Sequence, residues 1–240
     1  MTRIYVNLPL ASGQDCELPA VAAHHVRDVL RLTKDAELVL FDGRGGEYHA
    51  RLCSVGRAGV RAEVGARHEP SRESPLAVTL VQSISRGERM DYTLQKAVEL
   101  GVRDIVPVVS VRTVVKLDAA REAKRLEHWR GIVRHAAEQS GRTHLPSIAP
   151  VVPLGAWLAE RGALTAYLLD PQASRRLATE PAPDNGVAIL AGPEGGFDPD
   201  ERQRMLDLGV VPVRLGPRIL RTETAALCAL AVMQARWGDV

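Results

Sequence analysis

The sequence has few aromatic residues and no long apolar run. Two Phe, four Tyr and three Trp among 240 residues argue against extensive stacking of aromatic side chains on nucleic-acid bases. No apolar run approaches the roughly 20 residues that a membrane helix needs. The first residues, "MTRIYVNLPL", lack the apolar core and the cleavage site of a secretory signal. We therefore expect no membrane partner.

Cysteine is also scarce. Cys16, Cys53 and Cys228 are scattered and form no C-x-x-C pair. An odd number of thiols without metal-ligand spacing argues against disulfides and against a metal site, and it predicts a cytoplasmic protein.

A strong excess of one charge is missing as well. The 31 basic residues nearly balance the 29 acidic ones, which leaves a net charge of +2. That balance does not by itself indicate a nucleic-acid partner. Arginines do cluster between Arg57 and Arg103. They favour a polyanionic partner if several share one face, and otherwise they form solvated faces.

The first 75 residues have the pattern of strands and turns. The stretch "ELVLFDGRGGEYHARLCSVG" alternates apolar and polar residues around a glycine-rich turn, which predicts a β-hairpin. A further strand is expected in "VRAEVGAR". The stretch "AVAAHHVRDVLRL" predicts a helix with Val21, Val26, Val29 and Leu30 near one face. The segment 68–75, "HEPSRESP", has the composition of a linker.

From Leu76 onward strand patterns alternate with helix patterns, which predicts an α/β fold with a mostly parallel sheet covered on both faces. The expected strands are 76–85, 105–110, 165–170, 186–192 and 210–216. The expected helices are 87–101, 118–140, 154–162, one opening at Asp198 with a capping box, and 222–237.

Two loops that follow predicted strands have an unusual composition. They are "GPEGG" at 192–196 and "LGPRILR" at 215–221. Ligands bind outside the carboxyl ends of parallel strands, and glycine lets the backbone approach a flat ligand. Tight strand-to-helix turns are the alternative. Neither loop matches a Gly-x-Gly-x-x-Gly or phosphate-loop pattern.

These residues carry a resemblance. "AGPEGGF" together with "LGPRILRTETAAL" resembles the ribosomal RNA small subunit methyltransferase E family, within the knotted SPOUT methyltransferase superfamily. Further matches are "HHVRDVLR", "FDGRGGE", "ESPL", "SRGERMDYTLQKAVELGV", "EQSGR" and "RWGD". The similarity therefore extends over nearly the whole chain.

The resemblance implies two domains: a PUA-like β-barrel that binds RNA at 1–72, and a SPOUT methyltransferase domain with a C-terminal trefoil knot at 73–240. It also implies S-adenosyl-L-methionine as cofactor and a homodimer with each active site near the subunit interface. The substrate would be 16S ribosomal RNA of the small ribosomal subunit. The product would be N3-methyluridine in the decoding region.

On this basis we expect the cofactor to contact both loops and the start of the last helix. The expected cofactor-binding residues are Leu190, Gly192, Pro193, Glu194, Gly195, Gly196, Leu215, Gly216, Ile219, Leu220, Arg221, Thr222, Glu223 and Thr224. Core packing is the alternative for Leu190, and helix capping is the alternative for Thr222.

The expected catalytic residues are Arg221, which would stabilise a developing uracil anion, and Glu194, which would serve as base. Arg218 is the alternative for the first role. A loop-shaping salt bridge is the alternative role for Glu194. Glu223 is the alternative base, but for Glu223 a salt bridge to Arg221 is the preferred interpretation. Expected RNA contacts are Arg3, Arg31, Arg86, Arg89, Arg134 and Arg142.

Two other functions remain open at this point. A non-catalytic RNA-binding or ribosome-assembly factor would have the same fold without needing an intact cofactor pocket. A nucleotide-dependent enzyme on a doubly wound sheet would need the phosphate-binding loop that this sequence lacks.

Overall fold

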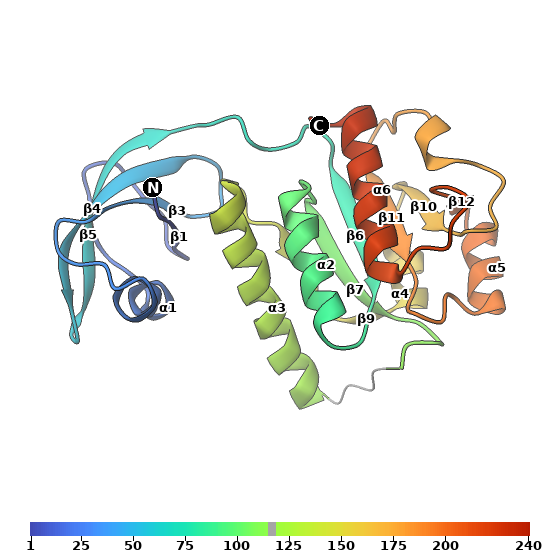
Figure 1. Ribbon diagram of the computed structural model, residues 1–240, viewed down its shortest axis with the longest axis horizontal. Coiled ribbons are helices and arrows are strands. Elements are labelled where there is room, and N and C mark those ends of the chain that lie inside the picture. Colours follow the sequence, from blue (N-terminus) through green and yellow to red (C-terminus); the bar gives the residue numbers. More distant parts are fainter. Residues whose placement is uncertain (115–118) are drawn as a thin grey trace. The chain divides into compact units, whose positions relative to one another are not determined.

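The chain folds into two compact units. The computed structural model describes residues 1–114 and 119–240 (Figure 1). The first unit comprises Met1–Glu73 and Ala137–Leu145, and the second comprises Ser74–Ala136 and Pro146–Val240. Each is described by itself below.

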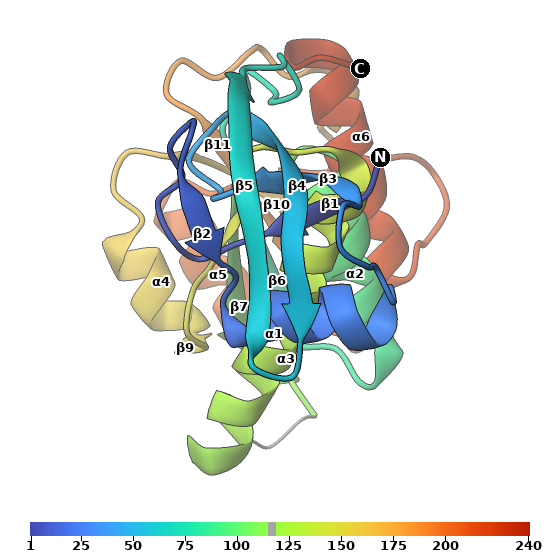
Figure 2. The same cartoon turned by 90° about the vertical axis from the view of Figure 1, so that its left-hand side faces the viewer.

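The first unit contains a five-stranded sheet, which faces the reader in Figure 2. Its strand order is β1 (Arg3–Tyr5), β3 (Glu37–Phe41), β4 (Glu47–Gly56), β5 (Gly59–His68) and β2 (Asp15–Glu17). The β1–β3 pair is parallel and the other pairs are antiparallel.

The predicted hairpin is confirmed by the antiparallel pairing of β3 with β4, in which Leu40 lies opposite Tyr48. The intervening turn uses positive φ angles at Gly43, Gly45 and Gly46. Glycine adopts these angles at little cost because it has no Cβ. Leu38 and Leu52 are fully buried and contribute to the core beneath the sheet.

The predicted helix near residue 20 is present, but its predicted apolar face is wrong. An α-helix, α1 (Ala20–His24), continues into a π-helical turn, η1 (His25–Val29). Val26 is buried, whereas Val21 and Val29 are each 59% exposed. A π turn has i→i+5 hydrogen bonds and therefore more residues per turn, so the 3.6-residue spacing fails beyond His25, and Leu30 is exposed as well. Val21 precedes the π turn, which therefore does not account for its exposure. Ala22 and Ala23 join Val26 in the core instead.

The second unit contains a seven-stranded sheet in which all strand pairs are parallel. The strand order is β12 (Val211–Val213), β10 (Thr165–Leu169), β11 (Val187–Ala191), β6 (Val78–Ser83), β7 (Asp104–Val109) and β8 (Ser147–Ile148), and β9 (Val152–Pro153) also pairs with β7. The prediction of a mostly parallel sheet is confirmed. The two-residue strands β8 and β9 were not predicted, because such short pairings leave no periodicity.

Helices cover both faces of this sheet, as predicted. On one face, Leu154 and Leu158 of α4 (Leu154–Glu160) and Met205 of α5 (Pro199–Asp207) pack with Ala188 and Leu190 of β11. On the other face α2 (Glu88–Glu99) lies beside α6 (Thr222–Trp237), which contacts β11 and β6 (Figure 1). A short 3-10 helix, η2 (Leu177–Thr179), also contacts α6.

The predicted helix signals are confirmed. Helix α2 buries Met90, Leu94, Ala97 and Val98 and is followed by Gly101 with φ 78°. Helix α5 has the expected capping box, in which the Asp198 side chain accepts from the backbone of Asp200 while Glu201 reaches back to the Asp198 backbone.

Helix α3 (Ala119–Ser140) buries the predicted stripe of Leu126, Trp129, Val133 and Ala136. The predicted start at Asp118 lies outside the described residues. No helix in the described part of the chain is both long enough and apolar enough to cross a bilayer.

Candidate active site

A cavity of about 810 Å³ opens in the second unit at the carboxyl ends of three neighbouring strands. Loops that follow β10, β11 and β12 form its walls, together with the first turn of α6. This is the edge of a parallel sheet at which ligands bind. Its loop residues include Leu168–Gln172, Ala191–Phe197 and Val213–Gly216, with Arg218–Glu223 and Ala225 closing the far side.

Twelve of the fourteen expected cofactor residues line this cavity. They are Gly192, Pro193, Glu194, Gly195, Gly196, Leu215, Gly216, Ile219, Leu220, Arg221, Thr222 and Glu223. The structure does not bring the other two to it. Leu190 is fully buried in the core between the sheet and α4, and Thr224 is exposed on α6. Ile219 is 85% exposed, so it contributes at the rim and not as a buried floor.

The loop after β11 has a compact turn that needs glycine at two places. The backbone N–H of Gly196 donates to the Pro193 carbonyl at 2.9 Å, and Gly196 has φ 69°. A Cβ on Gly192 would lie 3.2 Å from the Phe197 ring. The backbone of this loop is therefore held close to the end of β11, and its glycines border the cavity without a Cβ.

Glu194 is tied to the element that follows β6. Its carboxylate accepts from the Arg86 backbone N–H at 3.1 Å and from Arg89 Nη1 at 3.0 Å. Burial raises the pKa of Glu194, but these hydrogen bonds outweigh it, so the pKa lies below its usual range. The carboxylate is therefore ionised and occupied, which is the loop-shaping salt bridge expected as the alternative to a base.

Thr222 joins the two loops directly. Its hydroxyl donates to the carbonyl of Gly192, the first residue of the glycine-rich loop, at 2.5 Å. The N-cap of α6 is Arg221, and no side chain caps the helix. The Thr222 hydroxyl therefore bridges loops and does not cap the helix.

The expected ion pair between Glu223 and Arg221 is not formed among the described residues. The Glu223 Oε2 atom is buried and has no hydrogen-bond partner. Arg221 and Arg218 are exposed at the cavity and have no ion-pair partner within the described chain. Among the described residues, the guanidinium groups of Arg218 and Arg221 therefore have no ion-pair partner, and Glu223 Oε2 has no hydrogen-bond partner.

The sequence interpretation missed the third loop, which follows β10. The Asp170 carboxylate accepts from Arg202 Nε of α5 at 2.8 Å, and both residues line the cavity. Arg112 lies at the cavity too, and its Nη1 donates to the Gly195 carbonyl at 3.1 Å. The signal for Asp170 was present, because it follows a predicted strand whose carboxyl end meets the same sheet edge.

The six arginines expected to contact RNA are placed very differently. Arg31 and Arg86 are exposed, Arg134 is partly buried, and Arg89 is paired with Glu194 in the cavity. The Arg31 backbone has φ 54°, which is uncommon for a residue other than glycine.

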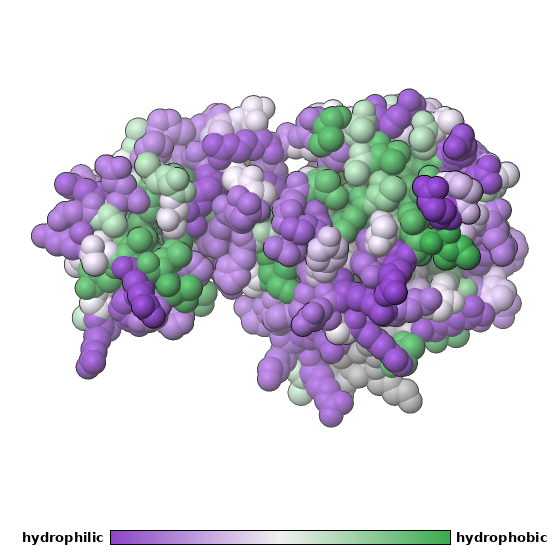
Figure 3. All heavy atoms as spheres, viewed as in Figure 1, coloured by the Kyte–Doolittle hydropathy of each residue, from purple (hydrophilic) through white to green (hydrophobic). Residues whose placement is uncertain are grey.

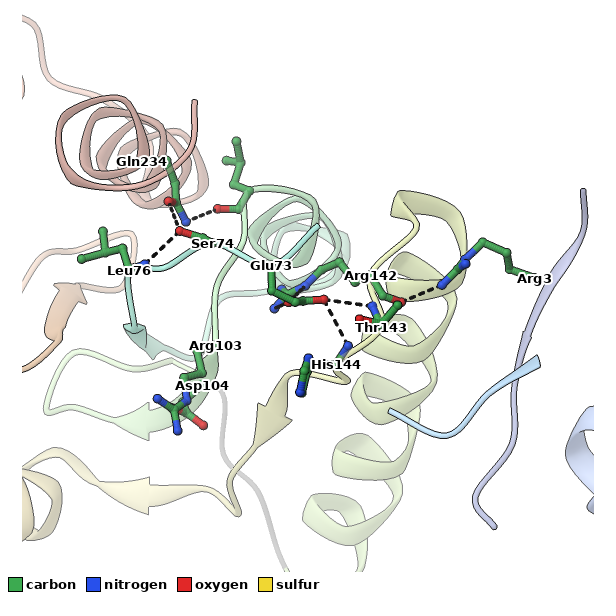
Figure 4. A network of polar contacts seen from close by, with 11 residues as sticks. Arg3, Glu73, Ser74, Leu76, Arg103, Asp104, Arg142, Thr143, His144 and Gln234 are labelled. Atoms are coloured by element: carbon green, nitrogen blue, oxygen red, sulfur yellow. Dashed lines mark hydrogen bonds and ion pairs between the residues drawn. The ribbon is translucent and has the colours of Figure 1, made fainter. Parts of the chain in front are cut away.

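Arg3 and Arg142 belong to a polar network in the first unit (Figure 4). Arg142 is 6% exposed and donates to Glu73 Oε2 from Nε at 2.9 Å and from Nη2 at 2.7 Å. Arg3 pairs with Glu47 and donates to the Arg142 carbonyl. Burial first, and the nearby Arg72 next, lower the pKa of Arg3 to about 10. These contacts account for both side chains without RNA.

Two family models match this chain. A family model described as "RNA methyltransferase domain" matches residues 72–234, and one described as "RNA methyltransferase PUA domain" matches residues 21–64. With a parallel α/β unit and a smaller β-rich unit, the chain is an RNA methyltransferase, and the predicted fold class is confirmed.

The chain belongs to the ribosomal RNA small subunit methyltransferase E family. It is 31% identical over 239 residues to the member from Buchnera aphidicola (subsp. Schizaphis graminum), covering 99% of this chain and 97% of that protein. It is 35% identical over 223 residues to the Mycobacterium tuberculosis member, covering 89% of this chain and 84% of that protein.

Solved structures agree with this assignment. The Neisseria gonorrhoeae ribosomal RNA small subunit methyltransferase E, bound to S-adenosyl methionine, matches with a TM-score of 0.93 and 41% identity over 100% of this chain and 99% of that one. A methyltransferase from Legionella pneumophila in complex with the same cofactor matches with a TM-score of 0.95 and 39% identity, again over 100% and 99%. These matches give no support to the nucleotide-dependent enzyme.

Proposed function

We propose that this enzyme methylates N3 of one uridine in the decoding region of 16S ribosomal RNA, with S-adenosyl-L-methionine as methyl donor. The observation that carries the proposal is the bond between Thr222 and Gly192, which brings the two glycine- and proline-containing loops to one cavity. The relatives described above are named for the ribosomal RNA of the small subunit, and two similar structures contain the donor.

The donor fits the wall formed by the two loops. Gly192, Gly196 and Gly216 line this wall, and because glycine has no Cβ the donor can approach the backbone closely there. Leu215 and Leu220 provide apolar surface for the adenine ring. Each loop contains a proline, and the hydrogen bond from Thr222 to Gly192 joins the two loops, so less conformational entropy is lost when the donor binds.

The chemistry requires N3 of the uracil to lose its proton, because the protonated nitrogen is a weak nucleophile. The bound donor supplies an electrophilic methyl group whose bonding pair leaves with sulfur. We assign stabilisation of the uracil anion to Arg221, with Arg218 at the same cavity, since neither guanidinium has an ion-pair partner among residues 1–114 and 119–240. Holding the base in line adds to the rate by proximity.

Of the three carboxylates at the cavity, Asp170 is paired with Arg202, and Glu223 is a better proton acceptor than Glu194. Glu194 is occupied by Arg86 and Arg89, and its pKa is lowered, so it has little tendency to take a proton. The Glu223 Oε2 atom has no hydrogen-bond partner within the described chain. We therefore assign the role of base to Glu223. Glu194 shapes the glycine-rich loop after β11.

RNA binding is assigned to both parts of the chain, with residues 1–72 as an RNA-binding domain and 73–240 as the methyltransferase domain. The exposed guanidinium groups of Arg31 and Arg86 suit phosphate contacts, which position RNA without reading its sequence. The target base has to leave its stack to reach the cavity. An enzyme that acts on the small ribosomal subunit works in the cytoplasm.

The proposed homodimer is supported by the composition of α6. This helix is apolar on nearly all sides, and such helices are normally buried all round. Ala226, Ala229, Leu230 and Met233 are buried, but Leu227, Cys228, Ala231 and Val232 remain partly exposed. Figure 3 shows hydrophobic residues gathered over and beside α6. A second copy packed on this face would cover it, and light scattering should give the mass of two chains.

The decisive test is methylation of purified small subunits and of free 16S RNA by the purified protein, with labelled donor. Mass spectrometry of the RNA should find one added methyl group on a uracil, at a position left unmethylated in cells that lack the protein. A protein that binds the RNA and S-adenosylhomocysteine but adds no methyl group would be the non-catalytic factor instead. Failure to bind S-adenosylhomocysteine in calorimetry would overturn the proposal itself.

A further inference from the structure

A buried glutamine outside both loops makes hydrogen bonds that bear on the cavity. Gln82 is the second-last residue of β6 and is fully buried. In the sheet it lies in register with Ala191, the residue before the glycine-rich loop. It does not line the cavity itself, and its amide therefore acts through neighbours.

Two acceptors fix the orientation of the Gln82 amide. Its Nε2 donates to the Ser83 carbonyl at 2.9 Å and to Thr222 Oγ1 at 3.1 Å. A carbonyl oxygen only accepts, so the nitrogen and not the oxygen of the amide has to face Ser83. Both amide hydrogens are then used.

This orientation determines what the Thr222 hydroxyl does. A hydroxyl has one hydrogen to donate, and Gln82 Nε2 offers only donors. The Thr222 hydrogen therefore has to point to another acceptor, and the Gly192 carbonyl is the one it meets. The bonds form a chain with one direction, from Gln82 to Thr222 to Gly192.

The arrangement has a cost that needs an explanation. The Oε1 atom of Gln82 is buried and has no hydrogen-bond partner in the described structure. Leaving a buried acceptor unpaired is unfavourable, and a buried apolar side chain would avoid the cost. A polar side chain at such a position is best explained by the hydrogen bond that its nitrogen donates to Thr222.

We propose that Gln82 is a positioning residue for the methyl donor, which acts by holding Thr222 so that the two cavity loops stay in register. The inference rests on the proposed donor binding. Without Gln82, the Thr222 hydroxyl is free to turn away from Gly192, and the loops have to be ordered again when the donor arrives. Donor affinity then falls, while the step that involves the RNA is affected less.

The test compares two buried glutamines of the second unit. Gln234 is 1% exposed and also makes two side-chain hydrogen bonds, with Ser74 and Leu100, but it lies near the other end of α6 and does not line the cavity (Figure 4). Gln82→Met and Gln234→Met each replace a buried amide with an apolar side chain of similar length. Thermal unfolding measures how far each change destabilises the fold, and calorimetry measures the affinity for S-adenosylhomocysteine.

We expect Gln82→Met to weaken S-adenosylhomocysteine binding about tenfold, and to raise KM for the donor with kcat changed less. Gln234→Met should leave the affinity within about twofold at a similar loss of thermal stability. The single variants Gln82→Met and Thr222→Val break the same chain of hydrogen bonds. The Gln82→Met/Thr222→Val double variant should therefore bind S-adenosylhomocysteine no more weakly than whichever single variant binds it less tightly.

The outcomes separate the inference from the function on which it rests. If the wild-type protein binds S-adenosylhomocysteine and both glutamine variants bind equally well, Gln82 has no positioning role. Equal weakening by both variants would mean a general effect on stability and would also overturn the inference. If the wild-type protein does not bind S-adenosylhomocysteine, the proposed function fails and the inference falls with it.

Discussion

The Arg89 guanidinium donates to the Glu194 carboxylate at 3.0 Å, so helix α2 and the glycine-rich loop after β11 are joined by an ion pair. Burial by itself would raise the pKa of Glu194, but the hydrogen bond from the Arg86 backbone, and then the contact with Arg89, hold that pKa below its usual range. A residue in this state shapes a loop well and accepts a proton poorly.

Glu194 and Glu223, two of the carboxylates at the cavity, should respond differently to removal of their charge. Glu194→Gln should keep methylation within about tenfold of wild type and should leave its pH dependence between about pH 6 and pH 9 unchanged. Glu223→Gln should lower kcat by about a hundredfold or more, because loss of a general base typically costs that much. Single-turnover methylation across pH measures both. The opposite ranking would return the role of base to Glu194.

Arg221 should matter for chemistry more than for donor binding. Arg221→Ala should lower kcat by about a hundredfold, as removal of a group that stabilises developing charge does. It should change S-adenosylhomocysteine affinity by less than about threefold. Arg236→Ala, an exposed arginine in the last turn of the same helix, is the control and should change neither. Equal losses of rate and affinity in Arg221→Ala would assign the residue to the donor.

Gly216 tests whether the second loop approaches the donor closely. Gly216 lines the cavity, and a Cβ built on it meets no atom within 4 Å. Gly216→Ala should therefore leave thermal stability nearly unchanged but weaken S-adenosylhomocysteine binding by about tenfold or more. Gly56→Ala is matched to it, because its Cβ also points into open space, but Gly56 is not among the cavity residues. Unchanged affinity in Gly216→Ala would show that the donor does not come close there.

Glu73 should stabilise the first unit in a pH-dependent way. Burial raises its pKa, but hydrogen bonds from Arg142 and from the backbone of Thr143 and His144 outweigh burial and lower that pKa. A lowered pKa in the folded state stabilises the protein above the unfolded pKa of about 4.5, and this stabilisation is lost as pH falls further.

We therefore expect Glu73→Gln to reduce the free energy of unfolding by about 3 kcal/mol at pH 7, because it removes a carboxylate that is hydrogen-bonded to the buried Arg142. The difference from wild type should shrink as pH falls below about 4.5. Urea unfolding at several pH values measures it. Glu63→Gln removes an exposed pair with Arg51 and should cost less than about 1 kcal/mol. A difference that stays constant down to pH 3 would contradict the assignment to Glu73.

Much of the fold could be predicted from local signals in the sequence. The stripe of Leu126, Trp129 and Val133 predicts α3 because a buried helix face repeats every 3.6 residues, and this periodicity is local. The capping residues Asp198 and Glu201 predict the start of α5 for the same reason. Val29 was assigned to the wrong face because a π turn changes the spacing without leaving a sequence signature.

The cavity could be located but its side-chain partners could not. Two loops at strand ends were enough to predict the place, since parallel strands bring their carboxyl ends to one edge. The partner of Glu194 is 105 residues away in the chain, and the interpretation of Glu223 as a partner of Arg221 relied on sequence proximity alone. Arg142 was expected to contact RNA, but it is buried and donates to Glu73, which lies 69 positions earlier in the chain.

The sequence by itself determined the alternation of strands and helices, the glycine and proline positions that shape the two loops, and the family to which they belong. These features depend on periodicity and backbone conformation, which neighbouring residues set. Only the tertiary structure decided which charges are occupied and which are free, and that Gln82, Thr222 and Gly192 form one chain of hydrogen bonds. The reason is physical. A hydrogen bond or an ion pair depends on distance in space, and residues as far apart in the chain as Gln82 and Thr222, 140 positions, meet only when the chain has folded.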